Sequence, residues 1–483
     1  MGLDALTGAR LRSGVALTAL LALMAACSPL TDAGQAPGGS TSSASTPPPP
    51  PAVFAELDPT LAPGKTATLK HDEVQVTSIV GTHDLPGLNH GTSIVRGHIL
   101  RQHAWSGGGK LSLTSKVVAS SSKVLAVAMH ADGKGGKRTA VVYYDPHTNA
   151  SFASPALIAP DKWNDFVTLV GTTARDVTIA KELTQPSWPM GGGPALAFSA
   201  DGDLVVQPQG GKKGVLIPEK KVSPMLTELG LRAKAGAQYA TPTEAAAEFE
   251  ATDPALVGVP AKGKDPRPTL GLGTDCTKKK CIAITFDDGP VPETQEVLDA
   301  LAKEEVPATF FVLGTSVDAA PDMVTRTAAA GMELGSHNQV HNAMTSVGDE
   351  RLAKQLDQSA GTIRKLAGQD PLFMRPPYGD HNKRVDAQIA KKGMSVAMWS
   401  VDTLDWKNKD TASILSKLDA QGESGGVVLM HDIHQSTRAA VPELITKLKK
   451  DGYTIVTLAE MGPDLYRPGK TFCHGPVVEK PCV

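Results

Sequence analysis

Between residues 281 and 460, short apolar runs alternate with amphipathic segments, a pattern that few folds accommodate. Strands that alternate with helices predict a parallel sheet with crossover helices. Seven candidate strands predict an α/β sheet that closes into a barrel with somewhat fewer strands than usual. The candidate strands read CIAITF, ATFFVL, MELGS, LFMRP, SVAMWS, GVVLM and TIVTL. The candidate helices lie at 293–304, 319–330, 349–367, 383–392, 411–420 and 437–450.

Residues 1–26 have the layout of an export signal. Arg10 and Arg12 precede the run GVALTALLALMAAC, which is shorter than the roughly 20 apolar residues of a membrane span. The run ends in LMAAC, which resembles the lipobox of bacterial lipoproteins, with Met24 where leucine is commoner. The resemblance implies cleavage before Cys27, acylation of its thiol, and a lipid anchor on the outer face of the bacterial cell membrane. Plain secretion with an unused Cys27 is the alternative.

The sequence predicts a separate N-terminal α+β domain in front of the barrel. Residues 27–53 are a Ser/Pro-rich linker, residues 54–250 the α+β domain, residues 251–275 a second linker, and residues 276–483 the barrel domain. The α+β domain has β-branched runs separated by turn signals, with helical periodicity near 161–182 and 222–233. Its order of runs resembles a domain of some bacterial envelope deacetylases and anti-sigma factors. Its role stays open.

The cysteines favour disulfides. Besides Cys27, the chain contains Cys276, Cys281, Cys473 and Cys482. An even number of thiols in an exported chain indicates disulfide pairing. Pairing within each end of the barrel domain and cross-pairing between the two ends are both compatible with the spacing. A zinc knuckle fits less well, because no CxxC spacing is present.

Ionisable residues follow five of the predicted strands. Because the carboxyl ends of barrel strands open at one mouth, we expect these residues to converge there. The five groups are Asp287 and Asp288; His337 and His341; Arg375 with Tyr378; Asp402, Asp405 and Trp406; and His431, Asp432 and His434.

These groups lie in the motifs TFDDGP, HNQVH, RPPY, DTLDW and LMH, in that order. The set resembles the five motifs of polysaccharide deacetylases of carbohydrate esterase family 4, over residues 281–460. The resemblance implies a distorted (β/α) barrel and metal-dependent removal of N-acetyl groups from sugar polymers, a hydrolysis of carbon–nitrogen bonds other than peptide bonds. One position departs from the family: Asn338 stands where Ser or Thr is usual, and an amide can do similar work.

Three of the residues form a candidate metal site. Asp288, His337 and His341 offer one oxygen and two nitrogens, and three protein ligands with an open position suit catalytic Zn²⁺ or another divalent transition metal such as Co²⁺. The same ligand set could hold iron in an oxygenase, but the acid and base residues beside it argue against that chemistry. Asp287 is the candidate general base, and Arg375 would pair with it and keep it ionised.

The remaining residues have predicted roles around the reacting amide. His431 is the candidate general acid, and a neighbouring Asp405 would keep it protonated. By family resemblance, the backbone N–H of Tyr378 stabilises the oxyanion. Trp406 and Leu429 would wall a pocket for the acetyl methyl group, or are simply core residues. Asp402, Asp432 and His434 are expected to form turns or support the site. A haloacid-dehalogenase phosphatase is disfavoured, because that class uses Asp-x-Asp rather than adjacent aspartates.

A lipid-anchored exported enzyme is placed to act on the cell wall, so the predicted substrate is N-acetylglucosamine in peptidoglycan. Chitin, another poly-N-acetylglucosamine and O-acetylated xylan are alternative substrates. A wall-binding or sensing lipoprotein with an inactive barrel is the alternative from another class. The net charge of −2 gives no reason to expect nucleic acid as a partner. The oligomeric state cannot be inferred from the sequence.

Overall fold

The computed structural model describes residues 52–475, apart from 62–63, 83, 185–192, 245–264, 266, 268–270 and 463–464. The predicted signal peptide, its Cys27, most of the second linker and Cys482 lie outside the described residues. No helix in the described part of the chain has both the length and the hydropathy to cross a membrane. The domain boundaries stay a prediction.

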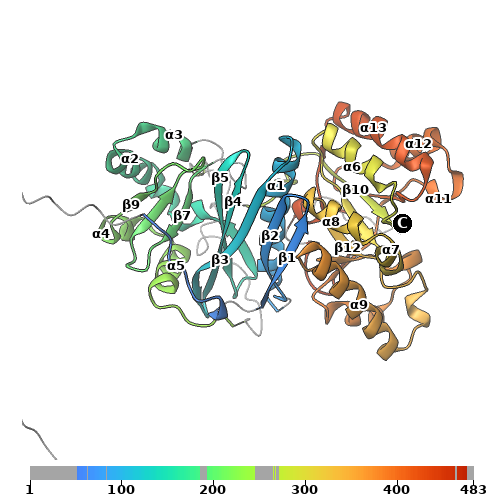
Figure 1. Ribbon diagram of the computed structural model, residues 1–483, viewed down its shortest axis with the longest axis horizontal. Coiled ribbons are helices and arrows are strands. Elements are labelled where there is room, and N and C mark those ends of the chain that lie inside the picture. The colour runs from blue at the N-terminus through green and yellow to red at the C-terminus, as the bar shows by residue number, and fades with distance from the viewer. Residues whose placement is uncertain are drawn as a thin grey trace, which may run out of the picture. The chain divides into compact units, whose positions relative to one another are not determined.

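The C-terminal half forms a curled parallel sheet surrounded by helices (Figure 1). The strand order is β15-β16-β10-β11-β12-β13-β14-β18, with β17 also paired to β10, and the strand pairs within this sheet are parallel. The order is an open path, and among the described residues no pairing joins β15 to β18. The predicted α/β class and distorted barrel are confirmed. The strands are β10 (Cys281–Asp287), β11 (Thr309–Val312), β12 (Glu333–Ser336), β13 (Phe373–Met374), β14 (Ser395–Ala397), β15 (Val401–Asp402), β16 (Gly426–Met430), β17 (Thr454–Ile455) and β18 (Thr471–Phe472).

Amphipathic helices cover the outside of this sheet. Their apolar stripes face the strands, as the helix α9 shows with buried Leu352, Leu356 and Ile363 on one face. At the end of α9, Gly368 adopts a left-handed conformation (φ 64°), which ends the helix and lets the chain pass close to the backbone of Leu69 in strand β1 (Lys65–His71). The helices are α6 (Thr294–Lys303), α7 (Gly314–Ala319), α8 (Pro321–Ala329), α9 (Asp349–Ala367), α10 (Lys383–Ala390), α11 (Asp405–Asn408), α12 (Thr411–Gln421), α13 (Gln435–Lys450) and α14 (Leu458–Met461).

The central strand β10 carries the site at its carboxyl end. All seven of its residues are buried, because it lies between β16 and β11 and is covered on both faces. A strand in this position needs a nearly continuous apolar sequence, which CIAITF supplies. The two aspartates that end this run therefore emerge from the middle of the sheet.

The N-terminal half contains two sheets and several helices, which confirms the predicted α+β class. A six-stranded sheet has the order β1-β2-β3-β4-β5-β6, and a three-stranded antiparallel sheet the order β7-β8-β9. The strands are β1 (Lys65–His71), β2 (Val74–Val80), β3 (Leu111–Ser121), β4 (Val124–Gly133), β5 (Gly136–Asp145), β6 (Ala150–Ala153), β7 (Ala195–Phe198), β8 (Leu204–Gln207) and β9 (Val215–Ile217). The helices are α1 (Pro86–Trp105), α2 (Trp163–Ala174), α3 (Val177–Thr184), α4 (Glu219–Val222) and α5 (Glu228–Gln238).

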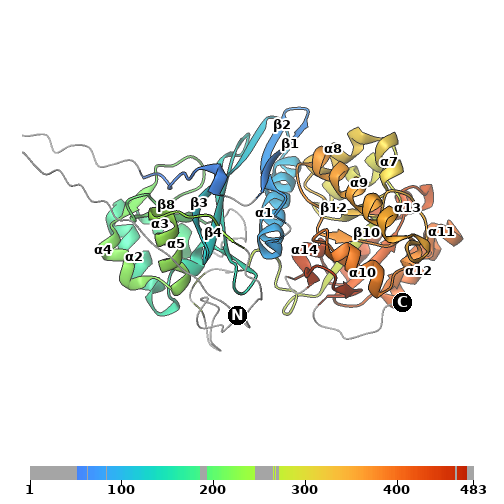
Figure 2. The same ribbon diagram turned by 90° about the horizontal axis from the view of Figure 1, so that it is seen from below.

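The helix α1 lies between strand β5 and the barrel helices α8 and α14 (Figure 2). Its buried Arg101 donates to the carbonyl oxygen of Gly331 (2.8 Å) and pairs with Glu460. His90 contacts the carbonyl oxygen of Ala459 (2.8 Å). Gly331 precedes β12, so α1 covers the amino ends of the barrel strands, opposite the end where Asp287 emerges. The N-terminal half therefore supports the barrel without contributing to its mouth.

We expect Arg101→Met to destabilise the chain by about 3–5 kcal/mol, because it leaves the Glu460 carboxylate buried without its cation. The shift in urea midpoint measures the loss. In the double variant Arg101→Met/Glu460→Gln both charges are absent and the amide keeps the cap of α14, so most of the stability should return. A double variant as unstable as the single one would show that the ion pair is not the cause.

One of the predicted disulfides is described completely. Cys276 and Cys281 are bonded to each other at the start of β10. This bond confirms local pairing and excludes cross-pairing between the two ends of the barrel domain. Cys473 is disulfide-bonded as well.

Candidate active site

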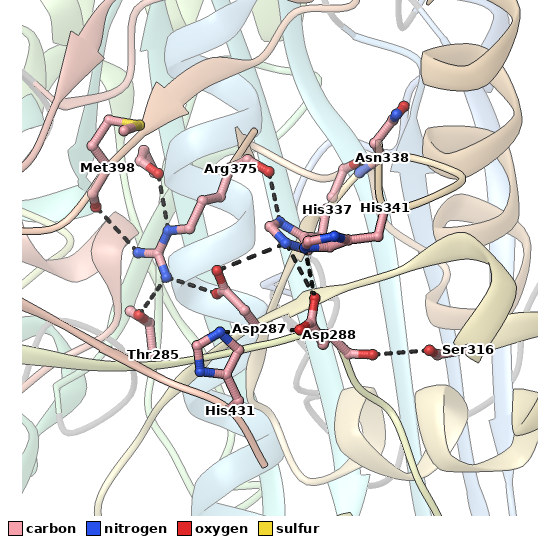
Figure 3. Close-up of polar contacts among 12 residues, drawn as sticks. Thr285, Asp287, Asp288, Ser316, His337, Asn338, His341, Arg375, Met398 and His431 are labelled. Carbon is pink, nitrogen blue, oxygen red and sulfur yellow. Dashed lines mark hydrogen bonds and ion pairs between the residues drawn. The ribbon is translucent and has the colours of Figure 1, made fainter. Parts of the chain in front are cut away.

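The two adjacent aspartates point in different directions (Figure 3). Asp287 is the last residue of β10 and is buried, with its Oδ1 accepting a hydrogen bond from Arg375 Nη1 (2.7 Å). Asp288 adopts a left-handed conformation (φ 71°), which an aspartate tolerates better than most residues. The turn of the backbone at Asp288 directs its carboxylate toward His337 and His341. Asp287 is thus paired with Arg375 and Asp288 with the two histidines, while Oδ2 of Asp287 also lies 4.0 Å from Nε2 of His337.

Asp288, His337 and His341 form the three-residue group predicted to bind a metal. Their ligand atoms all lie within 4.8 Å of one another. The Asp288 Oδ1 atom lies 3.3 Å from Nε2 of His337 and 3.4 Å from Nε2 of His341.

The chemistry of this group fits a divalent cation. Nδ1 of His337 lies 2.7 Å from the carbonyl oxygen of Arg375, so it carries the proton and leaves Nε2 as a lone pair facing the group. Burial lowers the pKa of His341, which favours the neutral imidazole that metals require. Oδ1 of Asp288 is buried and has no hydrogen-bond partner among the described residues. The lone pairs of these ligand atoms thus converge on one point without a hydrogen-bond donor, and a bound cation would compensate for this.

The loop between the two histidines is held by Asn338, the position that departs from the family pattern. Asn338 is buried and has φ 68°. Its Nδ2 lies 3.1 Å from Oε1 of Gln355, 3.2 Å from Oδ1 of Asn342 and 3.2 Å from the carbonyl oxygen of Val340. The amide therefore steadies the loop, as the sequence led us to expect.

Arg375 is fully buried and fixes the position of Asp287. Its Nη1 donates to Asp287 and to Oγ1 of Thr285, both at 2.7 Å, and its Nε and Nη2 donate to the carbonyl oxygens of Ala397 (3.0 Å) and Met398 (3.2 Å) (Figure 3). These four hydrogen bonds fix the guanidinium group, and the fixed guanidinium in turn fixes the position of the Asp287 carboxylate. The predicted pairing of Arg375 with Asp287 is present.

His431 faces the group from the other side. Its Nδ1 lies 2.9 Å from Oδ1 of Asp405, and its Nε2 lies 4.0 Å from Oδ2 of Asp288. Asp405 is fully buried, and its Oδ2 accepts from the backbone N–H of His431 (2.7 Å) and from Oγ1 of Thr437 (2.6 Å). Burial alone would lower the pKa of His431, but the Asp405 carboxylate outweighs it and raises the pKa to about 9. The imidazole is therefore cationic at neutral pH, as a general acid needs to be.

The predicted substrate-contacting residues lie in two different surroundings. The exposed Tyr378 has φ 60°, and its ring packs edge-on against His341 with 4.3 Å between ring centroids. Trp406 is 49% exposed, so it is not a core residue, whereas Leu429 on β16 is buried. The structure excludes core packing for Trp406 and leaves both alternatives open for Leu429. Their contacts with the substrate stay predictions.

Comparison with known proteins places the chain in a family. A family model described as "Polysaccharide deacetylase" matches residues 274–397. The chain is 35% identical over 189 residues to a peptidoglycan-N-acetylglucosamine deacetylase of Bacillus cereus, a match that covers 38% of this chain and 88% of the relative. The chain belongs to the polysaccharide deacetylase family. The predicted family resemblance is confirmed.

Two other relatives of this deacetylase family match over a smaller share of their length. Peptidoglycan-N-acetylglucosamine deacetylase PgdA of Listeria monocytogenes is 40% identical over 194 residues, covering 40% of this chain and 41% of the relative. Peptidoglycan-N-acetylmuramic acid deacetylase PdaC of Bacillus subtilis is 38% identical over 184 residues, covering 38% and 39%. The match thus spans about two fifths of the length of each of these two relatives.

Three of the five deacetylase motifs lie within the residues that the family model matches. DTLDW and LMH lie beyond residue 397, where the structure nevertheless brings Asp405 and His431 to the same mouth as the first three motifs. The geometry therefore extends the site past the residues matched by the family model.

Two residues of the site were missed by sequence reasoning. Thr285 accepts from Arg375 and donates to the carbonyl oxygen of Val428 (2.6 Å), and Thr437 donates to Asp405. A single threonine within a strand or a helix gives no functional signal, so neither residue stood out. The one signal for Thr285 was its place as the first letter of TFDDGP. Thr437 lies inside α13 and carried no signal.

Asp402 and Asp432 have the supporting positions expected of them. Asp402 Oδ1 accepts from the backbone N–H of Leu404 (2.9 Å) and shapes the turn before α11. Asp432 is buried, its Oδ2 accepts from Oγ1 of Thr294 at the start of α6, and its carboxylate lies against Gly289. Asp432 therefore packs against the loop that carries Asp288. His434 occupies the N-cap position of α13 without a capping hydrogen bond from its side chain, and it is half-buried beside His431.

We expect Asp405→Asn to lower kcat by about 10²-fold, because the amide cannot hold His431 protonated and aligned. Loss of the carboxylate lowers the pKa of His431, so the alkaline limb of the pH–rate profile should move to lower pH. Thr437→Val, which removes one hydrogen bond from Asp405 but keeps its charge, should move the limb much less. An alkaline limb at the same pH in Asp405→Asn would contradict the assignment of His431 as the acid.

Proposed function

We propose that the chain is a metal-dependent hydrolase that removes N-acetyl groups from N-acetylglucosamine in peptidoglycan. The observation that carries the proposal is the arrangement of the site. The three candidate ligands lie between two further groups. On one side is the carboxylate of Asp287, held by Arg375, and on the other is the imidazole of His431, held by Asp405. Base and acid on opposite sides of a cation site are what hydrolysis of an amide requires.

Asp288, His337 and His341 would hold the ion, for which we propose Zn²⁺ or another divalent transition metal such as Co²⁺. When bound, such an ion supplies Lewis acidity, which makes a water more acidic and polarises a carbonyl group. The metal identity is tested by metal analysis of the purified chain and by readdition of single metals after chelation.

Two residues beside the ligands carry out the proton transfers, one as a base and one as an acid. Asp287, held ionised by Arg375, accepts a proton from the attacking water. The backbone N–H of Tyr378 donates to the carbonyl oxygen of the acetamide as negative charge develops on it. His431 donates a proton from Nε2 to the departing nitrogen, because an amine leaves poorly unless protonated, while Asp405 stabilises the imidazolium. Trp406 and Leu429 would enclose the acetyl methyl group.

The substrate proposal has two supports. Two of the relatives reported above are peptidoglycan-N-acetylglucosamine deacetylases by name, and the N-terminal sequence resembles a lipoprotein signal, which would place the enzyme beside the wall. The name of PdaC makes N-acetylmuramic acid a second candidate. The lipid anchor at Cys27 is itself a proposal, tested by labelling with a radioactive fatty acid, which Cys27→Ser should abolish.

The deciding experiment measures acetate release from peptidoglycan, chitin oligomers and acetylated xylan, each with and without a chelator. We expect acetate release from peptidoglycan, and we expect the chelator to stop it. Mass spectrometry of the product should show that the lost acetyl groups came from the glucosamine residues. Release only from chitin or xylan would reassign the substrate, and release on muramic acid would reassign the sugar. Failure on every substrate in the presence of metal would favour a wall-binding or sensing role.

A further inference from the structure

A cavity of about 270 Å³ lies in the N-terminal half, on one face of the six-stranded sheet. Its floor includes His130 on β4 and Thr139 on β5, which stand opposite each other in the antiparallel register. Nδ1 of His130 lies 3.2 Å from Oγ1 of Thr139. Ala126 and Ala128, which alternate with this position on the same face of β4, are core residues. The apolar face of the sheet therefore becomes polar where the cavity begins.

An aromatic side chain forms one wall of the cavity. The segment 52–57 crosses the sheet and is tied down by backbone hydrogen bonds from Ala55 to Phe198 (2.8 Å) and from Leu57 to Val117 (3.1 Å). These bonds place the half-buried ring of Phe54 at 6.1 Å from the ring of His130, with the two planes 38° apart. The two rings form a tilted aromatic wall beside the polar floor.

The charges around the cavity are balanced. Glu56 is paired with Lys116 (2.5 Å), and Lys137 lies 4.0 Å from Asp132. Burial, helped by Lys116, lowers the pKa of His130, so its ring is neutral at neutral pH. A near-neutral lining offers little to a phosphate or a polyanion. It suits a neutral ligand with many hydroxyl and amide groups, which can hydrogen-bond with Thr139, Glu56 and Gln207.

The shape of the site also argues against an extended peptide. The described strands that line the cavity, β3, β4, β5 and β8, are all inner strands of their sheets, so none of them offers a free edge for a peptide strand to join. The volume is slightly below the roughly 300–1,000 Å³ of pockets that enclose a drug-sized ligand. A single ring of a longer chain fits such a volume, with the neighbouring rings left in solvent.

We propose that this cavity binds a neutral N-acetylhexosamine unit of a glycan chain, with the sugar ring stacked on Phe54. The cavity shares no residue with the candidate active site. It is a second glycan-binding site, which raises the affinity of the chain for polymers by multivalency and leaves the chemistry of the mouth unchanged. The inference does not depend on the proposed hydrolysis, because binding is measured without turnover.

The test compares variants of the whole chain for retention on insoluble chitin, a glycan that carries no peptides. We expect Phe54→Ala to weaken retention about tenfold, as loss of an aromatic contact does. Glu56→Ala, at an exposed position that does not threaten the fold, should weaken it in the same direction. The matched control is Tyr239→Ala, which removes an exposed aromatic ring of the same half of the chain and should bind like the wild type. Equal retention of the Phe54 and Tyr239 variants would overturn the proposal.

Two further readouts distinguish glycan binding in this cavity from peptide binding there and from the chemistry of the mouth. Hydrolysis of a soluble short oligomer should be unchanged in Phe54→Ala, whereas the KM for polymer rises. If the Phe54 and Glu56 variants bind chitin normally but lose retention only on peptide-bearing peptidoglycan, the cavity recognises the stem peptide and the proposal is wrong. Chitin retention that depends on Phe54, in a chain that releases no acetate, would support the binding site while rejecting the proposed activity.

Discussion

Asp287→Asn is expected to lower kcat by about 10²–10⁴-fold, the usual contribution of a general base. The amide cannot take a proton from the attacking water at neutral pH. It keeps the size of the side chain, and Asp288 and the two histidines are untouched, so the metal content of the purified variant should equal that of the wild type. Acetate release and metal analysis on the same sample give the two measurements.

The same substitution should also weaken the fold, which the experiment has to separate from catalysis. Arg375 is fully buried and Asp287 is the carboxylate that neutralises it, so the variant leaves a buried charge without its partner. We expect a loss of about 3–5 kcal/mol in unfolding free energy. The assay is therefore run well below the melting temperature of the variant. Asp402→Asn is the matched control, since an asparagine still accepts from Leu404 and the variant should remain active. Retained activity in Asp287→Asn would reject Asp287 as the base.

His337→Ala is expected to lower metal affinity by at least about 100-fold, because loss of even an outer partner of a ligand costs about 10–100-fold. His337 supplies one of the three ligand atoms and is the more buried of the two histidines. Activity should fall together with bound metal and recover only partly at high metal concentration. Titration with Zn²⁺ or Co²⁺, followed by acetate release, measures both effects.

The control for this variant is His381→Ala. His381 belongs to the same half of the chain but is bonded to Asp386 (2.9 Å) and lies outside the three-residue group. Its replacement should leave the metal content unchanged. If His337→Ala binds metal as tightly as the wild type, the proposed ligand set is wrong, whatever happens to the activity.

The periodic part of the barrel was predictable from the sequence because each helix buries a stripe and each inner strand is apolar throughout. The predicted helix 349–367 coincides with α9, and 411–420 lies within α12. The two-residue strands β15 and β18 were not predicted, because neither was picked out as an apolar run of the kind that marked the equally short β13 and β17. The short helix α7 was also missed.

The sequence by itself determined the class of the barrel and the identity of its candidate ligands, acid and base. These depend on local periodicity and on residue types within short motifs. Only the tertiary structure decided how these residues act together. The left-handed turn at Asp288 separates the two carboxylates, Thr285 and Thr437 complete the bonding of Arg375 and Asp405, and Cys276 pairs with Cys281 rather than with a distant thiol. The contact of α1 with the base of the barrel was equally unpredictable. Such contacts join residues up to several hundred positions apart. The local sequence pattern does not indicate which distant groups will pair with a buried charge.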